Sequence, residues 1–313
     1  FKENLDKYII ANEFIFFKRF YCYNKFLNEE LHQWKQLLPN GKEENKIICV
    51  WNDIFYMTKN IFKGTAHIQC FPLYLYEPNG NRVDGISDFI FQKAKDKYNN
   101  NNITKEQIFY YVFGYINNKN YKIKYANNFL KEELPKLPLV DDYNDFINIS
   151  NKGNELADLY LNYDKGKFNS DCKLFYKDNE IIINEELHNA LTLYKDDLII
   201  SEDDKQMRFL KGEQNGKKED IQTTIIYNKY FKITNIPLKA YNFKLGQKSV
   251  IEHLMTSYKH SIDKDSGIKN NPNDFGVEID NPAYILETIL RMIEVSLRSL
   301  EIIEKLSSSS FCC

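Results

Sequence analysis

The sequence predicts a mixed α+β fold of helices and short strands, with a helical middle region and a strand-rich C-terminal half closed by a long C-terminal helix. Two patterns lead to this prediction. Short apolar runs bounded by turn residues fill the first eighty residues and return after residue 205, which is typical of strands. Apolar residues at helical spacing dominate the middle of the chain and its end.

The N-terminal half is predicted to contain strands followed by helices. The strands are expected at residues 14–17, 47–51 and 71–76. The helices are expected at about 86–94, 104–115, 119–132 and 142–163. The turn Glu77-Pro78-Asn79-Gly80 ends the last strand, a capping box from Thr104 to Gln107 opens the second helix, and Pro135 and Pro138 stop the third.

The C-terminal half returns to strands before its last helix. Strands are expected at residues 207–210, 223–227, 230–233 and 241–245. Asn228-Lys229 predicts a tight hairpin, and Gly246-Gln247 leads into a helix at 249–258. Asn281 and Pro282 predict the start of the final helix. Its expected buried stripe is Ile285, Ile289, Met292, Leu300 and Ile303.

These elements suggest two parts. Residues 1–165 form an N-terminal α+β part, and residues 166–313 form a strand-rich basic part with the C-terminal helix; packing as one domain is also compatible with the pattern. The net charge of the whole chain is -2, yet residues 205–269 carry 13 Lys and Arg against six Asp and Glu, a net +7. The second part is therefore locally basic.

Composition excludes several classes. The six cysteines are scattered without paired spacing, which indicates reduced thiols in a cytoplasmic protein. No run of eighteen apolar residues exists to span a membrane. Because the sequence begins at Phe1 without an initiator Met, we expect a fragment of a longer polypeptide.

Four short motifs resemble catalytic or metal sites but lack essential parts. Asn281-Pro282-Ala283-Tyr284 resembles an amino-methyltransferase loop, without the glycine-rich turn that binds the methyl donor. The segment 212–218 is too short for a phosphate-binding loop and is expected to be a solvated loop. Asp171-Cys172-Lys173 offers half of a nuclease metal site, and His67 with Cys70 offers half of a zinc site. We predict no catalytic residue and no metal site.

Two basic, polar segments are the candidates for binding DNA. The first is expected to form a strand, a turn and a helix start, from which side chains and helix N–H groups could meet phosphates. Its candidate residues are Lys239, Tyr241, Lys244, Gln247 and Lys248. The second is a polar loop whose groups can bond to base edges or phosphate oxygens. Its candidates are Lys264, Ser266, Lys269, Asn270 and Asn273. A solvated loop beside a charged strand is the alternative interpretation.

Six segments, in order along nearly the whole chain, resemble the C-terminal region of type ISP restriction-modification enzymes. They begin with Gln-Cys-Phe-Pro-Leu-Tyr at residues 69–74 and end with Asp-Ser-Gly-Ile-Lys-Asn-Asn-Pro-Asn-Asp at 265–274. The other four lie at residues 103–114, 134–139, 156–163 and 225–228. Residues 164–204 and the tail from Ser307 to Cys313 depart from the family's pattern. Target recognition sequences are expected to vary most where they touch bases, so the DNA sequence that is read cannot be carried over.

The resemblance implies a module that recognises a target in double-stranded DNA and is not itself catalytic. Nuclease, helicase-like motor and N6-adenine methyltransferase domains of the same polypeptide would precede it. S-adenosylmethionine, ATP and Mg²⁺ would then belong to those domains, and this chain would hold no cofactor. The alternatives are an interdomain scaffold or protein-interaction module without DNA contact, and a methyltransferase in its own right.

Overall fold

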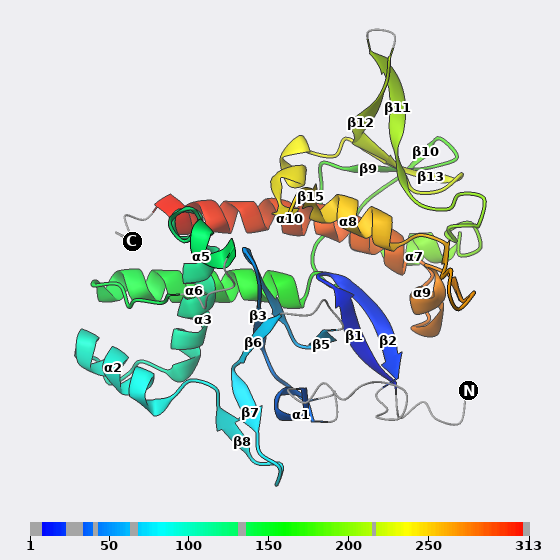
Figure 1. The fold of residues 1–313 in the computed structure, drawn as a ribbon. Coiled ribbons are helices and arrows are strands. Elements are labelled where there is room, and N and C mark those ends of the chain that lie inside the picture. The colour runs from blue at the N-terminus through cyan, green and yellow to red at the C-terminus, as the bar shows by residue number, and fades with distance from the viewer. Residues whose placement is uncertain are drawn as a thin grey trace. The chain divides into compact units, whose positions relative to one another are not determined.

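The chain folds into two compact units, which are described separately. The computed structural model describes residues 8–22, 34–39, 43–62, 68–130, 136–214 and 217–308. Unit 1 comprises Phe1–Leu161 and Glu301–Cys313, and unit 2 comprises Asn162–Leu300. The sequence-based boundary lay at residue 165, and it had assigned the end of the last helix to the second part. The predicted mixed α+β class is confirmed (Figure 1).

Unit 1 begins with small sheets and continues into helices. Its strands are β1 (Tyr8–Phe14), β2 (Phe17–Cys22), β3 (Ile47–Trp51), β4 (Ile54–Thr58), β5 (Ile61–Phe62), β6 (Gln69–Pro72), β7 (Tyr74–Tyr76) and β8 (Arg82–Asp84). Its helices are α1 (Trp34–Leu37), α2 (Asp88–Tyr98), α3 (Lys105–Asn117), α4 (Lys119–Lys124), α5 (Ala126–Leu130) and α6 (Tyr143–Leu161). The strands form the sheets β2-β1-β5 and β4-β3-β6 and the hairpin β7-β8.

The core of unit 1 lies where α3 packs on α6. The predicted capping box starts α3: the Thr104 side chain accepts from Gln107 N, and the Gln107 side chain accepts from Thr104 N. Nine of the thirteen residues of α3 are buried, which is more than one amphipathic face supplies. Tyr111 stacks near Phe146 of α6, with ring centroids 4.9 Å apart. This helix pair forms the packed centre of unit 1.

Two elements of unit 1 differ from the prediction. The strand expected at residues 14–17 is wrong, because Ile15 and Phe16 form the turn that joins β1 to β2. Both turn residues are buried, so four apolar residues in a row resembled a strand. The third helix is split into α4 and α5, with Tyr125 between them. Residues 131–132, at its predicted end, lie outside the described residues.

Unit 2 contains a five-stranded sheet, two small hairpins and several helices. Its strands are β9 (Lys173–Tyr176), β10 (Asn179–Ile181), β11 (Arg208–Gln214), β12 (Lys217–Ile226), β13 (Phe231–Thr234), β14 (Lys244–Leu245), β15 (Lys248–Ser249), β16 (Ser261–Ile262) and β17 (Lys269–Asn270). Its helices are α7 (Leu187–Thr192), the 3₁₀ helix η2 (Leu238–Asn242), α8 (Val250–Ser257), α9 (Asp274–Glu278) and α10 (Tyr284–Ser308), whose last turns belong to unit 1. The antiparallel sheet has the order β10-β9-β13-β12-β11.

The β12–β13 hairpin forms at Asn228, as predicted. Ile225 pairs with Ile233, and the Asn228 side chain accepts hydrogen bonds from Tyr230 N and Phe231 N, both at 2.9 Å. An asparagine side chain that bonds its own backbone two residues further on stabilises such turns. The hairpin holds Phe231 and Ile233 in the core of unit 2, where both are buried.

Helix α10 follows its predicted stripe only in its first half. Ile285, Ile289 and Met292 are buried, whereas Leu300 and Ile303 are half-buried. In the second half, buried positions include the two serines Ser296 and Ser299. Ser296 Oγ donates to Met292 O at 2.7 Å, which satisfies the hydroxyl within the helix. Because the predicted stripe contained only apolar residues, it missed these small polar positions.

Candidate nucleic-acid interface

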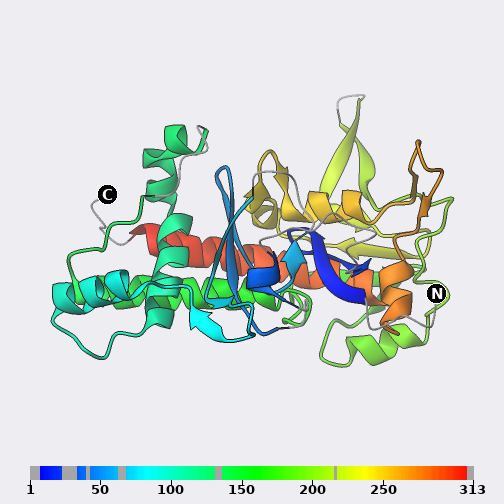
Figure 2. The same ribbon diagram turned by 60° about the horizontal axis from the view of Figure 1, so that its bottom comes forward.

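Two hairpins of unit 2 start from a shared base. Gln206, just before β11, forms an isolated antiparallel bridge with Lys259, just before β16. The amide of His260 donates to Lys205 O at 2.9 Å, and Asn270 Nδ2 donates to Lys259 O at 2.9 Å. Figure 2 shows the β11–β12 and β16–β17 hairpins rising on the same side of unit 2. Backbone bonds at their bases therefore fix the direction of one hairpin against that of the other.

The β16–β17 hairpin is an exposed finger. All nine residues from 261 to 269 are exposed. Asp263 Oδ1 accepts from Ser266 N at 2.8 Å, Ser266 Oγ at 2.7 Å and Asp265 N at 3.2 Å. These hydrogen bonds, those from Ser266 foremost, hold the pKa of Asp263 below its usual value. Ser266 therefore shapes the turn, and Lys264 extends from it as an exposed cation.

The remaining predicted residues of this segment have different roles. Lys269 Nζ lies 3.5 Å from Glu202 Oε1, and with side chains 71% and 73% exposed this pair is weak and can exchange for a phosphate. Asn270 is partly buried and supports Lys259. Asn273 is buried: its Oδ1 accepts from Ile200 N at 3.1 Å and its Nδ2 donates to Ile200 O at 2.9 Å. The predicted DNA contact by Asn273 is wrong, because both ends of its amide are used inside the fold.

The second predicted segment forms an exposed basic turn. Gly246 has a positive φ of +66° and sharply reverses the chain between β14 and β15. Four predicted residues on η2 and this turn are exposed, namely Lys239, Lys244, Gln247 and Lys248. The sequence from Ile236 to Ile251 contains no Asp or Glu. Three lysines and one amide are therefore presented without a carboxylate from their own segment.

Three expectations for this segment differ from the structure. The strand expected at 241–245 is shorter than predicted: Tyr241 and Asn242 end the helix η2, and only Lys244 and Leu245 pair as β14. Tyr241 is buried, and its hydroxyl donates to Gln222 O at 2.7 Å, so it supports the fold and cannot contact a base. Ser249 and Glu252 form a capping box at the start of α8. The Glu252 carboxylate occupies the helix end at which a phosphate was expected.

The sequence analysis missed the β11–β12 hairpin as a candidate. It assigned residues 212–218 to a solvated loop, but Gly212 lies in β11 and Lys217 and Lys218 lie in β12. The signal that could have found the hairpin is Asn215-Gly216, a dipeptide favoured in two-residue hairpin turns. Residues 215 and 216 themselves lie outside the described residues.

Asn281-Pro282-Ala283-Tyr284 has a structural role at the start of α10. Asn281 Oδ1 accepts from Ala283 N at 3.0 Å, and its Nδ2 lies 3.4 Å from Glu287 Oε2. Tyr284 is buried, with its hydroxyl 3.4 Å from Asp164 Oδ2. Glu287 also accepts from Arg291 Nη1 at 3.0 Å and contacts His188 Nδ1 at 2.8 Å. The amide and the tyrosine are therefore engaged within unit 2.

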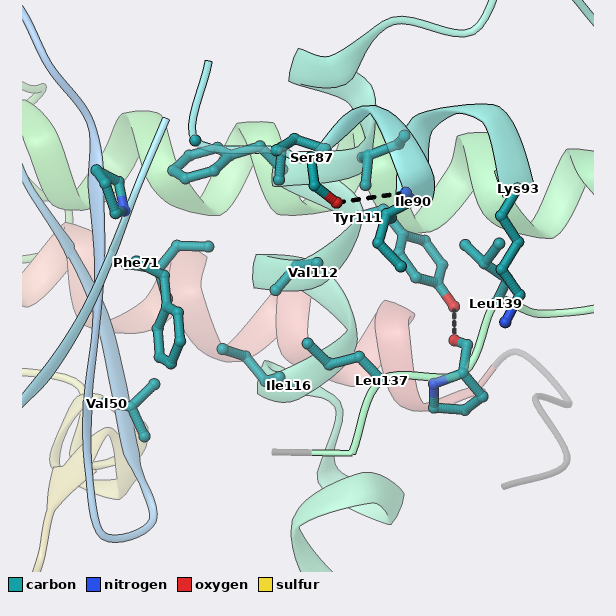
Figure 3. A pocket seen from close by; sticks show the side chains of 17 residues that line it. Val50, Phe71, Ser87, Ile90, Lys93, Tyr111, Val112, Ile116, Leu137 and Leu139 are labelled. Carbon is teal, nitrogen blue, oxygen red and sulfur yellow. Dashed lines mark hydrogen bonds between the residues drawn. The ribbon is translucent and has the colours of Figure 1, made fainter. Parts of the chain in front are cut away.

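Unit 1 contains an apolar cavity of about 440 Å³. Figure 3 shows Phe71, Val112, Ile116 and Leu137 around it. Its polar lining side chains are Ser87, Lys93 and Tyr111; the Tyr111 hydroxyl is already bonded to Pro138 O at 2.6 Å. A site for chemistry on a substrate needs convergent polar groups, which this lining lacks. The cavity suits an apolar occupant.

Metal ligands do not gather in the described ranges, where no group of three or more His, Cys, Asp or Glu could hold an ion. His67 lies outside those ranges. Cys70 lies opposite Cys49 on β3, with the two Sγ atoms 3.8 Å apart.

In the part of the chain that the structure describes, no helix is long and apolar enough to cross a membrane.

The fold is that of a specificity domain. Residues 12–288 match the family described as the Type ISP C-terminal specificity domain, and the chain belongs to this family. No curated protein sequence matches significantly.

Among solved structures, the chain is similar to a nuclease-deletion mutant of the Type ISP restriction-modification enzyme LlaGI in complex with a DNA substrate mimic. The identity is 26%, the TM-score is 0.73, and the match covers 97% of this chain and 25% of that one. It is also similar to the ATP-dependent Type ISP enzyme LlaBIII bound to DNA, at 26% identity and a TM-score of 0.76, over 97% of this chain and 18% of that one.

A third structure shares the fold. This is the DrdV–DNA complex, at 21% identity and a TM-score of 0.76, over 98% of this chain and 29% of that one. The chain thus spans less than a third of the length of each of these proteins.

Proposed function

We propose that this chain reads a short target sequence in duplex DNA on behalf of a restriction-modification enzyme, and that bond-making belongs to other domains of the same polypeptide. The observation that carries the proposal is the exposed basic turn of β14–β15, next in sequence to α8, together with the exposed finger of β16–β17. Lysines set the register on phosphates, while amide side chains such as Gln247 discriminate base edges.

The likeness to Type ISP enzymes bound to DNA supports this proposal. In such an enzyme, the methyltransferase would receive an adenine flipped out of the stack while the specificity domain holds the distorted duplex. S-adenosylmethionine, ATP and Mg²⁺ would be bound by those other domains, and this chain would need no cofactor. The polypeptide would act in the cytoplasm, where its DNA substrate is found.

The proposal is tested by reversing charge at the two basic segments of the 313-residue chain. Four exposed lysines are changed to Glu: Lys244, Lys248, Lys264 and Lys269. Each lost phosphate contact reduces the slope of log K against log salt by about 0.9, so the slope should become shallower by about 3 to 4. Affinity for a random 30-base-pair duplex, measured by fluorescence anisotropy across a salt series, should fall by at least a hundredfold.

A matched control carries the same charge change in unit 1. It replaces four other exposed lysines by Glu: Lys93, Lys119, Lys124 and Lys136. Its DNA affinity should exceed that of the first variant by at least tenfold, because only nonspecific attraction to the duplex is lost. Equal affinity of the first variant and the wild type would refute the assignment of the basic segments.

A scaffold function without DNA contact is the second candidate, and the apolar cavity of unit 1 favours it. In that case neither charge reversal would alter binding, because the wild-type chain itself would show no salt-dependent affinity for DNA. A methyltransferase function would instead show uptake of S-adenosylmethionine in a calorimetric titration of the chain, which we expect to be absent.

A further inference from the structure

The outer half of the β11–β12 hairpin is a free two-stranded ribbon. In β12, only Ile225 and Ile226 pair with β13, the next strand of the sheet. From Leu210↔Ile221 outward to Gln214↔Lys217, the two strands pair with each other alone. Figure 1 shows this ribbon projecting from the five-stranded sheet. Its edges and faces are therefore available to a partner.

A bulge at the base sets the direction of the ribbon. The register jumps from Phe209↔Ile225 to Leu210↔Ile221, so residues 222–224 of β12 have no partner in β11. Two of their backbone carbonyls are bonded elsewhere: Gln222 O accepts from Tyr241 Oη at 2.7 Å, and Thr223 O accepts from Ile236 N at 3.1 Å. The Tyr241 ring also packs edge-on against Phe209, with centroids 5.7 Å apart. The segment that carries the basic turn thus locks the ribbon in place.

The ribbon has two chemically different faces. Leu210 and Ile221 lie opposite each other on one face and are 40% and 38% exposed. Ile221 covers Gly212, where an added Cβ would lie 2.7 Å from Ile221 Cδ1. On the other face, Lys211 Nζ and Asp220 Oδ1 form an ion pair at 2.5 Å. The apolar pair Leu210 and Ile221 therefore lies side by side on one face of the ribbon and is partly exposed to solvent.

We propose that this ribbon enters the major groove of the target duplex, with Leu210 and Ile221 against the methyl groups of thymine. This inference rests on the proposed function and identifies the structural element that contacts the bases. The major groove admits a two-stranded ribbon, and apolar side chains distinguish thymine there by its methyl group. Charge complementarity favours DNA over a protein partner, because exposed Arg208 flanks the ribbon and the segment with Lys239, Lys244 and Lys248 is bonded to its base.

The test begins with selection of bound duplexes from a random 20-base-pair library by the wild-type 313-residue chain. The enriched motif is then resynthesised with deoxyuridine in place of each thymine, which removes one methyl group at a time. The expected result is a five- to tenfold loss of wild-type affinity at one or two thymine positions. Ile221→Gln should bind the intact motif about tenfold more weakly and should lose the sensitivity to deoxyuridine at those positions.

Control variants separate reading from folding. Ile182→Gln changes an isoleucine that is 74% exposed and lies outside the ribbon and both basic segments, and it should retain the wild-type deoxyuridine profile. Circular dichroism melting checks each variant, and Leu210→Gln gives a second independent change in the ribbon. The deoxyuridine scan of the wild-type protein needs no variant at all.

The outcomes distinguish the two levels of proposal. A wild-type chain that enriches no motif would overturn the proposed function, and the inference with it. A wild-type chain that enriches a motif, but loses no affinity at any deoxyuridine, would overturn the inference alone. The same holds if Ile221→Gln and Leu210→Gln keep the wild-type affinity and profile, since another element would then read the site.

Discussion

Gly114 of α3 and Gly153 of α6 meet at the crossing of the two helices. A Cβ added to Gly114 would lie 3.2 Å from Gly153 Cα and 2.5 Å from Ile149 O. A Cβ added to Gly153 would lie 2.8 Å from Gly114 N and would overlap Tyr110 O. Backbone therefore faces backbone, and the crossing closes only because both positions lack a side chain.

Gly153→Ala should destabilise unit 1 by about 3 kcal/mol, because overpacking at a contact with rigid backbone forces the helices apart. Urea unfolding followed by circular dichroism measures the change. Gly166→Ala is the matched control, since its added Cβ would meet only Asn162 O at 3.8 Å, an ordinary contact. A Gly153→Ala protein as stable as the control would contradict the close packing.

Asn273→Ala should lower the stability of unit 2 by about 2 kcal/mol, because it removes the side-chain acceptor of the buried Ile200 N–H, whereas Ile200 O keeps its contact with His260 Nε2. Gln247→Ala should have the opposite profile: Gln247 is exposed, so stability is unchanged while DNA affinity falls. Thermal melting and anisotropy titration of both variants separate the two roles. If Asn273→Ala melted like the wild type, its assignment to the core would be wrong.

Asp263→Ala should loosen the β16–β17 finger without unfolding unit 2. The variant loses the acceptor for Ser266 N and Ser266 Oγ, so trypsin should cleave after Lys264 faster and the Ser266 amide should exchange faster. Asp265→Ala is the control and should leave both rates unchanged.

Acid should mimic Asp263→Ala. The folded pKa of Asp263 lies below its usual value, so the turn is fully stabilised above that usual value. The stabilisation is lost as pH falls through the folded pKa. A protection factor at Ser266, corrected for the intrinsic exchange rate at each pH, that did not fall in acid would contradict this role of the carboxylate.

Lys122 predicts a pH dependence on the alkaline side. Burial lowers its pKa from 10.5 to about 8, although the charge of Asp53 opposes the shift. Its Nζ lies 4.9 Å from the centroid of the Phe55 ring. Between pH 8 and 10.5 the folded chain binds fewer protons than the unfolded chain, so the free energy of unfolding should rise with pH across this window.

Lys122→Met should remove that rise, whereas Lys124→Met, at an exposed position, should keep it. Urea unfolding of the three proteins at pH 7.5, 9 and 10 gives the comparison. Because the two variants each lose one lysine, at a buried and at an exposed position, the difference between their slopes isolates the burial of Lys122. Parallel slopes would mean that the ammonium group is solvated.

Local signals in the sequence predicted the elements that local physics governs. The capping box at Thr104, the Asn228 hairpin and the start of α8 at Ser249 depend on hydrogen bonds within a few residues, and the structure contains all three. The predictions that were wrong also share a cause, which is burial by tertiary packing. Ile15 and Phe16 form a turn that tertiary packing buries, and buried serines line α10 where only apolar residues were expected.

The residues of the candidate site show the same difference between local and long-range control. Exposed lysines at 244, 248 and 264 could be selected from a basic, polar sequence. The burial of Tyr241 and Asn273 could not, because their partners Gln222 and Ile200 lie 19 and 73 residues away along the chain. Nor did the sequence indicate that the bases of β11 and β16 are joined through Gln206 and Lys259.

The sequence by itself determined the α+β class, most element positions, the basic character of residues 205–269 and the resemblance to type ISP enzymes. These properties follow from composition, periodicity and contacts between near neighbours. Tertiary structure alone decided which polar side chains remain free and which direction each hairpin takes. Hydrogen bonds between distant segments control both, since a buried amide or hydroxyl that meets a backbone group far along the chain is no longer available to DNA.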